Sequence, residues 1–212
     1  MKLLQRVIGP VATNLYVLGD EASGEAIAID TATPCVDWVT QSLAERGWTL
    51  KLIASTHRHW DHIGDNAAVS EATGAKVAAH LLDRHGLENP QPNMAPFPIP
   101  PSIPAIDLAE GSEIRFGDIM LDVLHTPGHT EGSVCLLAKS ERLLFTGDTL
   151  FAGAWGRTDL PGGSEEQIID SLSRLSGLDD DLRVLPGHGN GSTIEVEKQW
   201  LEQVALTRRL PF

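Results

Sequence analysis

The segment STHRHWDHIGDN, residues 55–66, decides how this chain is interpreted. It holds three histidines and an aspartate within six positions, from His57 to His62. Imidazole and carboxylate groups are the usual nitrogen and oxygen ligands of transition metals. A polar loop that is rich in histidine by chance is the alternative interpretation. The choice depends on whether the rest of the chain predicts a scaffold and further ligands.

The composition of the 212-residue chain is that of an ordinary globular protein, with 42% hydrophobic and 21% charged residues. We expect one domain over residues 1–212, because single domains of this size are common. The formal net charge of -13 disfavours a nucleic-acid surface, which needs clustered lysine and arginine. An anionic substrate would need a local positive charge, and a bound dication could supply it.

The cysteines and the first residues favour a cytoplasmic location. Cys35 and Cys135 form no CxxC motif, and Cys135 lies in the apolar run SVCLLA, which predicts a buried thiol. Residues 1–21 lack the apolar core of a signal peptide and are interpreted as a first strand. No segment approaches the length of a transmembrane helix.

Both halves of the chain alternate between short apolar strands and helices with 3.6-residue periodicity. The first half predicts strands over 14–20, 25–31, 50–56 and 75–80, with a hairpin at 21–24, and helices over 36–47 and 64–74 that end at glycines. The second half predicts strands over 113–126, 133–138, 142–148 and 182–188, and capped helices over 164–175 and 192–206. Two packed sheets with helices outside are the natural α/β architecture for this order.

Residues 90–104 interrupt the pattern, because seven of the thirteen prolines fall there. They predict an extended loop without regular structure. A long loop in a compact domain is either a linker or a functional cover, and we favour a cover over the site.

The spacing of the ligands in residues 55–66 suggests two ions. His57 and His59 are two apart, so just after a strand both imidazoles can reach one ion. Asp61 and His62 are adjacent and would point toward a second position. Four ligands in six residues are too closely spaced for one tetrahedral ion, so two ions side by side are expected.

Further candidate ligands follow three later strands, each beside a glycine that leaves room for an ion. They are His129 in HTPGHTEGS, Asp148 in LFTGDTLF and His188 in VLPGHGNG. Each alone is more often a solvated turn residue or a helix cap. Three such junctions together with the first motif make chance improbable, and an aspartate such as Asp148 can bridge two cations.

The set of candidate ligands, in its order along the chain, resembles the ligand set of the metallo-β-lactamase superfamily. The set is His57, His59, Asp61, His62, His129, Asp148 and His188. The resemblance implies an αββα sandwich of two mixed sheets with the metals at one edge. It implies that one ion binds His57, His59 and His129. The other would bind Asp61, His62 and His188, with Asp148 bridging. Within the superfamily, four segments resemble motifs of the glyoxalase II-like (hydroxyacylglutathione hydrolase-like) members. They are THRHWDHIGDN, PGHTEGS, FTGDTLF and GRTDLPGG.

Two departures from that subfamily concern glutathione. Glyoxalase II enzymes carry a further C-terminal helical region that holds glutathione, whereas this sequence has one predicted helix after His188. Arg157 matches a basic residue that contacts glutathione in those enzymes, but Asp159 stands where they tend to have an aromatic residue. The chain resembles the compact bacterial forms. Arg157 is expected to pair with a substrate carboxylate or with an acid such as Asp159.

The other aromatic and histidine residues receive lesser roles. Trp155 is a candidate substrate wall, with core packing as the alternative, and Trp60 is expected to pack under the site. His125 is expected to be structural, and His80 and His85 to lie on the surface.

The expected reaction is thioester hydrolysis by a metal-bridging hydroxide, on a substrate of the S-lactoylglutathione type. Two cations can lower the pKa of a bridging water toward about 7 and polarise the carbonyl. Asp61 would also orient the nucleophile or take its proton. Zinc is the expected metal, with iron and manganese as alternatives.

Three other functions remain open from the sequence. Persulfide dioxygenases share the fold and use a single iron, and lactonases or β-lactamases share the ligand set. A metal-stabilised binding module is disfavoured because structural metal sites are usually closed. The predicted partner is a small thioester or ester, with no nucleic acid or membrane, and the sequence leaves the oligomeric state open.

Overall fold

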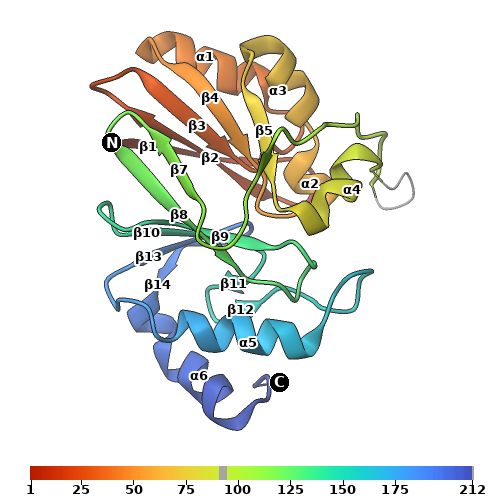
Figure 1. Ribbon diagram of the computed structural model, residues 1–212, viewed down its shortest axis with the longest axis vertical. Coiled ribbons are helices and arrows are strands. Elements are labelled where there is room, and N and C mark those ends of the chain that lie inside the picture. The colour runs from red at the N-terminus through yellow and green to blue at the C-terminus, as the bar shows by residue number, and fades with distance from the viewer. Residues whose placement is uncertain (91–94, 212) are drawn as a thin grey trace.

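The computed structural model describes residues 1–90 and 95–211. Two six-stranded sheets pack against each other, and helices cover both outer faces (Figure 1). This is the αββα sandwich of two mixed sheets that the sequence predicts. A further two-stranded ribbon, β11 (Leu150–Phe151) and β12 (Ala154–Trp155), lies beside the second sheet.

The first sheet has the strand order β1-β2-β3-β4-β5-β6. Its strands are β1 (Lys2–Ile8), β2 (Thr13–Asp20), β3 (Glu25–Ile29), β4 (Thr49–Ala54), β5 (Lys76–Ala79) and β6 (Ile106–Asp107). The first three are antiparallel, and β3 to β6 are parallel. Asp20 pairs with Glu25, which confirms the predicted hairpin at residues 21–24.

The second sheet has the order β14-β13-β10-β9-β8-β7. Its strands are β7 (Glu113–Phe116), β8 (Ile119–His125), β9 (Val134–Ala138), β10 (Leu143–Gly147), β13 (Arg183–Pro186) and β14 (Ser192–Thr193). The single strand predicted over 113–126 is wrong, because Phe116 pairs with Ile119 in a tight hairpin. Gly117 forms this turn with a φ of +53°, a backbone conformation that residues with a side chain rarely adopt.

Helices α1 (Val36–Arg46) and α3 (Asn66–Thr73) cover the first sheet, and α5 (Glu165–Leu175) and α6 (Ile194–Thr207) cover the second (Figure 1). Gly47 and Gly74 end α1 and α3 in the left-handed conformation, as predicted. Ser164 and Thr193 cap α5 and α6 by accepting a backbone N–H each. Two short helices, α2 (Trp60–Ile63) and α4 (Arg84–Glu88), lie near the predicted metal motif.

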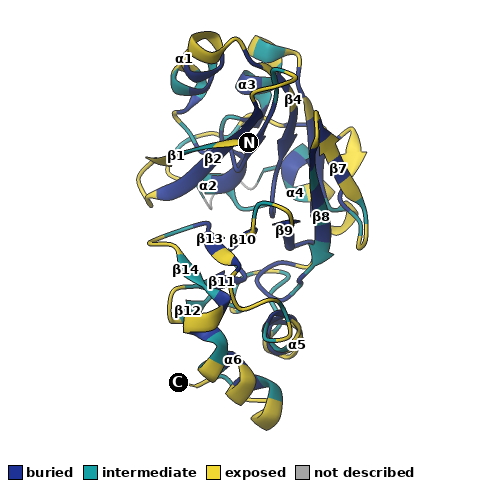
Figure 2. Cartoon of the chain, turned by 90° about the vertical axis from the view of Figure 1, so that its left-hand side faces the viewer, coloured by how far each residue is buried: buried dark blue, intermediate teal, exposed yellow. Residues whose placement is uncertain are grey.

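The core has three layers because inner strands of each sheet, such as β2 and β9, are buried on both faces (Figure 2). In β2, Tyr16 and Leu18 face the space between the sheets, whereas Leu15 and Val17 face the helices of the first half. In β9, Leu136 likewise faces the other sheet. Such strands read as continuous apolar runs, which is why they were predicted well.

The described part of the proline-rich segment has no helix or strand over residues 95–104, as predicted. Residues 91–94 of the predicted cover lie outside the described residues. The ring of Phe97 meets the ring of Trp60 edge-on, with 5.7 Å between centroids. Among the described residues, no helix has the length and apolar character needed to cross a membrane.

Candidate metal centre

The seven predicted ligands gather where loops and the short helix α2 follow strands of both sheets, and α2 carries Asp61 and His62. His57 follows β4 of the first sheet, and His129 follows β8 of the second. Asp148 and His188 come directly after the parallel neighbours β10 and β13. The carboxyl ends of strands are where ligand sites form in α/β sheets, because the loops there are free to vary.

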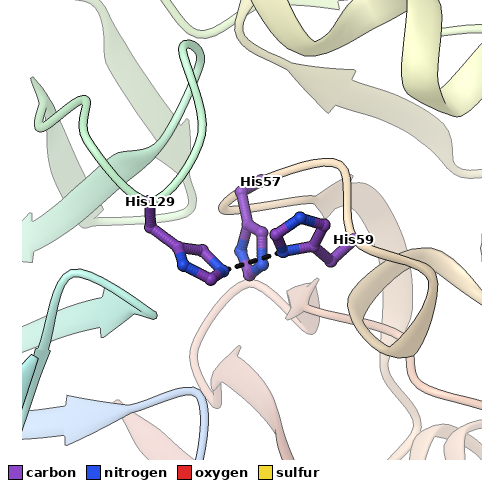
Figure 3. A group of neighbouring side chains, drawn as sticks. All are labelled: His57, His59 and His129. Carbon is purple, nitrogen blue, oxygen red and sulfur yellow. Dashed lines mark hydrogen bonds between the residues drawn. The ribbon is translucent and has the colours of Figure 1, made fainter. Parts of the chain in front are cut away.

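His57, His59 and His129 form the first cluster (Figure 3). One ring nitrogen from each lies within 4.8 Å of the others. Nδ1 of His59 and Nε2 of His129 are 2.8 Å apart, and the three rings face a common point (Figure 3). This arrangement can hold one ion through three imidazoles.

Asp61, His62 and His188 form the second cluster by the same criterion. Nε2 of His188 lies 3.1 Å from Oδ2 of Asp61 and 3.2 Å from Nε2 of His62. Asp148 lies between the clusters: Oδ1 is 3.4 Å from Nε2 of His62, and Oδ2 is 3.5 Å from Nε2 of His129. The structure thus brings all seven predicted residues together.

Two buried polar atoms at this centre have no hydrogen-bond partner: Nε2 of His57 and Oδ1 of Asp148. Leaving such atoms unpaired costs free energy, so native proteins rarely tolerate them. Both belong to a group in which ligand atoms of His57, His62 and Asp148 lie within 4.8 Å of one another. A metal ion would give both atoms a partner. The donor set of imidazole nitrogens and carboxylate oxygens fits a divalent ion such as zinc or iron.

Hydrogen bonds behind the rings fix which nitrogen is free. Nδ1 of His62 donates to Oδ2 of Asp30 at 2.9 Å, and Nδ1 of His129 donates to the carbonyl of Arg157 at 2.7 Å. Nδ1 of His188 donates to the carbonyl of Val11 at 3.1 Å. Each bond occupies Nδ1 and leaves Nε2 as the nitrogen that can bind a metal once it carries no proton.

Burial keeps the first cluster neutral. It lowers the pKa of His59 to about 3, helped by the neighbouring His129 and His62, and it lowers the pKa of His57 and His129 as well. Neutral imidazole is the form that binds metal. Burial would also lower the pKa of His62, but the carboxylates of Asp61, Asp148 and Asp30 raise it instead.

The second cluster is therefore the charged half of the centre. The pKa of Asp61 is lowered, since the charges of His62 and His188 outweigh the burial that would raise it. Two imidazole rings here share protons with carboxylates in the absence of metal. Metal binding to Asp61, His62 and His188 must displace those protons.

The sequence matches the metallo-beta-lactamase superfamily over residues 8–188, a span that contains both clusters. The chain belongs to the metallo-beta-lactamase superfamily. An uncharacterized protein of Mycobacterium tuberculosis is 35% identical over 208 residues, covering 91% of this chain and 92% of its own length. The hydroxyacylglutathione hydrolase of Maricaulis maris is 36% identical over 173 residues. That match covers 82% of this chain but 60% of the hydrolase.

Solved structures agree with this membership. BLEG-1, a B3 metallo-beta-lactamase, is 32% identical with a TM-score of 0.84, covering 96% of this chain and 99% of its own. ETHE1 from Myxococcus xanthus is 33% identical with a TM-score of 0.81, covering 97% and 85%. TTHA1623 in a di-iron-bound form is 32% identical with a TM-score of 0.81, covering 92% and 96%. A metal-binding role for this superfamily centre follows.

Gly187 packs its backbone directly against two of the candidate metal ligands, which explains why this position is a glycine. A Cβ at Gly187 would lie 2.2 Å from Oδ1 of Asp148 and 2.6 Å from Cε1 of His62. No side chain fits there without moving a ligand. The sequence therefore needs glycine directly before His188.

Asp30 is a residue of this centre that the sequence analysis missed. It is 1% exposed and holds a left-handed φ of +58°. Its carboxylate accepts from the backbone N–H and the hydroxyl of Thr56, at 2.7 and 2.8 Å, as well as from His62. It joins the strand end before His57 to a ligand of the other cluster. Its signal was available, since Asp30 follows the apolar strand β3 as Asp148 follows β10.

Asp30→Asn is expected to weaken metal binding by roughly 10- to 100-fold, because an amide orients the ring of His62 less firmly than a carboxylate does. Titration with zinc against a competing chelator measures this. Unfolding of the metal-free variant is measured alongside, to separate ligand orientation from general stability. An unchanged zinc affinity would exclude the orienting role.

Asp83 and Arg58 connect the loops that carry the first cluster, and neither was singled out from the sequence. Asp83 is fully buried, and its carboxylate accepts from the backbone N–H and Nη1 of Arg58, at 2.8 and 3.0 Å. It also accepts from the hydroxyl of Thr130 at 2.7 Å and the N–H of Gly132 at 3.0 Å. One carboxylate thus ties the neighbours of His57 and His59 to those of His129.

The predicted substrate residues lie close to the centre but are engaged elsewhere in the fold. Arg157 is exposed and forms two hydrogen bonds of 2.6 Å with Asp159, which lower the pKa of Asp159 to about 2. Trp155 packs against the apolar cluster of the second half, and its ring lies 5.9 Å from that of Trp200. Both substrate roles stay predictions.

The remaining histidines lie outside the two clusters. His85 is exposed, as expected. His80 is half-buried rather than a surface residue, because its ring stacks on that of His125 with 4.1 Å between centroids. His125 also hydrogen-bonds the carbonyl of Glu131, consistent with a structural role.

Proposed function

We propose that the protein is a dinuclear metal-dependent hydrolase that cleaves a thioester of the S-lactoylglutathione type. The observation that carries the proposal is the pair of three-residue clusters joined by a third group, His57, His62 and Asp148, in which Nε2 of His57 and Oδ1 of Asp148 are buried without a hydrogen-bond partner. The similarity to hydroxyacylglutathione hydrolases supports the thioester chemistry. A centre for a single ion would leave one cluster without purpose.

The residues divide into two sets of ligands. His57, His59 and His129 would hold one ion, Asp61, His62 and His188 the other, and Asp148 would contact both. Two divalent ions held side by side supply a hydroxide nucleophile at neutral pH and polarise a substrate carbonyl. Asp61 accepts a hydrogen bond from the hydroxyl of Thr13 at 3.2 Å, which fixes its carboxylate. Its second oxygen is available to orient the attacking water or accept its proton.

Zinc is the proposed metal, with iron and manganese as alternatives. Imidazole and carboxylate ligands bind all three, so availability decides among them. The di-iron form of a similar structure supports testing iron first among the alternatives. Metal analysis of protein purified without added metal would identify the occupant.

The decisive experiment is hydrolysis of S-lactoylglutathione by metal-loaded protein, with His59→Ala as the control. Turnover that the variant loses, and that a chelator removes, supports the proposal. Two bound metals without turnover would contradict the thioester assignment and direct the assay to lactones. One bound iron with oxygen consumption on a persulfide would replace the hydrolase assignment by a dioxygenase.

Arg157 is the proposed contact for a substrate carboxylate, and Asp159 competes for it. Arg157→Ala is expected to raise KM for S-lactoylglutathione by less than about fivefold, because ion pairs of exposed side chains are screened by solvent and contribute little. Asp159→Asn releases Arg157 and is expected to lower KM by a similar factor. Steady-state kinetics of both variants check this; shifts of KM in the same direction would refute the competition.

We further propose that the protein acts in the cytoplasm as one domain on a small-molecule substrate. Cys35 and Cys135 are both buried and unpaired, which fits a reducing compartment.

A further inference from the structure

A cavity of about 550 Å³ opens beside the metal centre, and the ligand His59 is part of its wall. Most of the remaining wall is apolar: Trp60, Ile63, Leu82, Pro90 and Pro161. We call this the His59 pocket. A larger hollow of about 960 Å³ beside β14 and α6 shares no residue with the metal clusters. Of these two cavities, the His59 pocket is the one whose wall includes a metal ligand.

The charges in the His59 pocket are already matched. Nη1 of Arg58 lies 3.0 Å from the carboxylate of Asp83 and 3.2 Å from that of Glu131. Nη2 donates to the carbonyl of Pro161 at 2.7 Å. The guanidinium is therefore neutralised by two carboxylates and has little attraction left for an anionic ligand. The net charge of -13 adds a general repulsion of anions.

The rim of the His59 pocket carries an exposed apolar side chain. Leu82 is 53% exposed, and the adjacent Leu81 is 60% exposed. Leu82 lines the pocket, whereas Leu81 does not. Apolar walls with a few polar groups are typical of small-molecule sites, and covering a leucine with an apolar ligand is favourable.

We propose that the His59 pocket binds an uncharged, apolar arm of the substrate, several carbons long. The proposal rests on the proposed function, since it takes the neighbouring metal centre as the place where a thioester is cleaved. It names the preferred substrate class as thioesters with a neutral hydrocarbon chain. Any carboxylates of the substrate would then lie outside this pocket, toward Arg157.

Binding can be measured without turnover by using thioethers, which cannot be hydrolysed. S-methyl- and S-hexyl-N-acetylcysteamine are titrated into metal-loaded protein by calorimetry. Affinity is expected to rise about fourfold for each methylene until the pocket is full, the gain for a buried CH₂ group. Leu82→Gln is expected to lower the affinity for the hexyl compound about fivefold and to leave that for the methyl compound unchanged.

Leu81→Gln is the matched control, because it makes the same change at an equally exposed neighbour outside the pocket. It is expected to bind both compounds as the wild-type protein does. Equal affinity for the methyl and hexyl compounds, or equal losses in the two leucine variants, would overturn the pocket assignment.

Hydrolysis of acetyl and hexanoyl thioesters of N-acetylcysteamine separates this proposal from the proposed function. A higher kcat/KM for the hexanoyl ester that Leu82→Gln alone removes supports both. Hydrolysis of the two esters at equal kcat/KM overturns the pocket and leaves the thioesterase. Chain-length-dependent binding without hydrolysis of any thioester overturns the thioesterase assignment and the substrate class with it.

Discussion

Asp148→Asn is expected to lower kcat/KM of the metal-loaded protein by on the order of 1,000-fold. Asp148 is within reach of both clusters: its carboxylate oxygens lie 3.4 Å from Nε2 of His62 and 3.5 Å from Nε2 of His129 and of His188. An amide of the same shape keeps the packing but removes the charge that balances two dications. A metal contributes several kcal/mol to the transition state, and each ~1.4 kcal/mol is a factor of ten in rate.

Metal content is the second readout for Asp148→Asn, and it is expected to fall below two ions per chain. Asp118→Asn is the matched control, since Asp118 is an exposed acid at the opposite end of β8 from the centre. It should keep both activity and metal content. Full metal content and activity in Asp148→Asn would show that the clusters work independently and that no bridging carboxylate is needed.

Asp83→Ala is expected to lower the free energy of unfolding by about 3–5 kcal/mol. The variant removes a fully buried carboxylate that accepts four hydrogen bonds, and it leaves the charge of Arg58 with a single exposed partner. Removing one member of a buried ion pair costs about this much, because the other charge stays uncompensated. Urea unfolding of the metal-free protein measures the loss.

Glu131→Gln is the comparison for Asp83→Ala, because it removes the other carboxylate that pairs with Arg58. Glu131 has a side chain that is 56% exposed, so the loss should stay under about 1 kcal/mol. Similar losses in both variants would mean that burial of Asp83 adds nothing. A loss of metal affinity in Asp83→Ala larger than in Glu131→Gln would further show that the link between the loops positions the first cluster.

The fold and the seven clustered residues could be predicted because short segments of the sequence contain their signals. Strands buried on both faces appear as apolar runs. His129, Asp148 and His188 each follow a strand and stand beside a glycine. The first motif supplies the other four within six positions. Local pattern and tertiary arrangement agree here, so the convergence of the seven side chains needed no knowledge of the packing.

The supporting residues could not be predicted in the same way. Asp83 looks like a surface acid in a polar stretch, and only packing buries it against Thr130 and Gly132, nearly fifty residues later. Arg58 stands among ligands and has no periodicity of its own, while its partner Glu131 is separated from it by 73 positions. Long-range pairs of this kind leave no trace in a local window of sequence.

The missed hairpin at Gly117 has a different cause. Residues 113–126 contain apolar residues on both sides of Gly117 and Asp118, so an alternating pattern runs through the turn. A Gly-Asp pair between two alternating runs is a hairpin signal by itself. In residues 113–126 the apolar period and the turn residues predict different structures, and the turn residues Gly117 and Asp118 decide the outcome.

The hydrogen bond between Val11 and His188 has a consequence for the order in which the two clusters can form during synthesis. The carbonyl of Val11 accepts from His188, and the side chain of Asn14 bonds the carbonyls of Pro186 and Gly189. His188 is the last of the seven ligands along the chain, and Val11, which anchors it, is made before any of them. A nascent chain therefore contains all three histidines of the first cluster before the second cluster is complete. Such a chain could capture one ion early, whereas the paired centre waits for the first strands to meet the last.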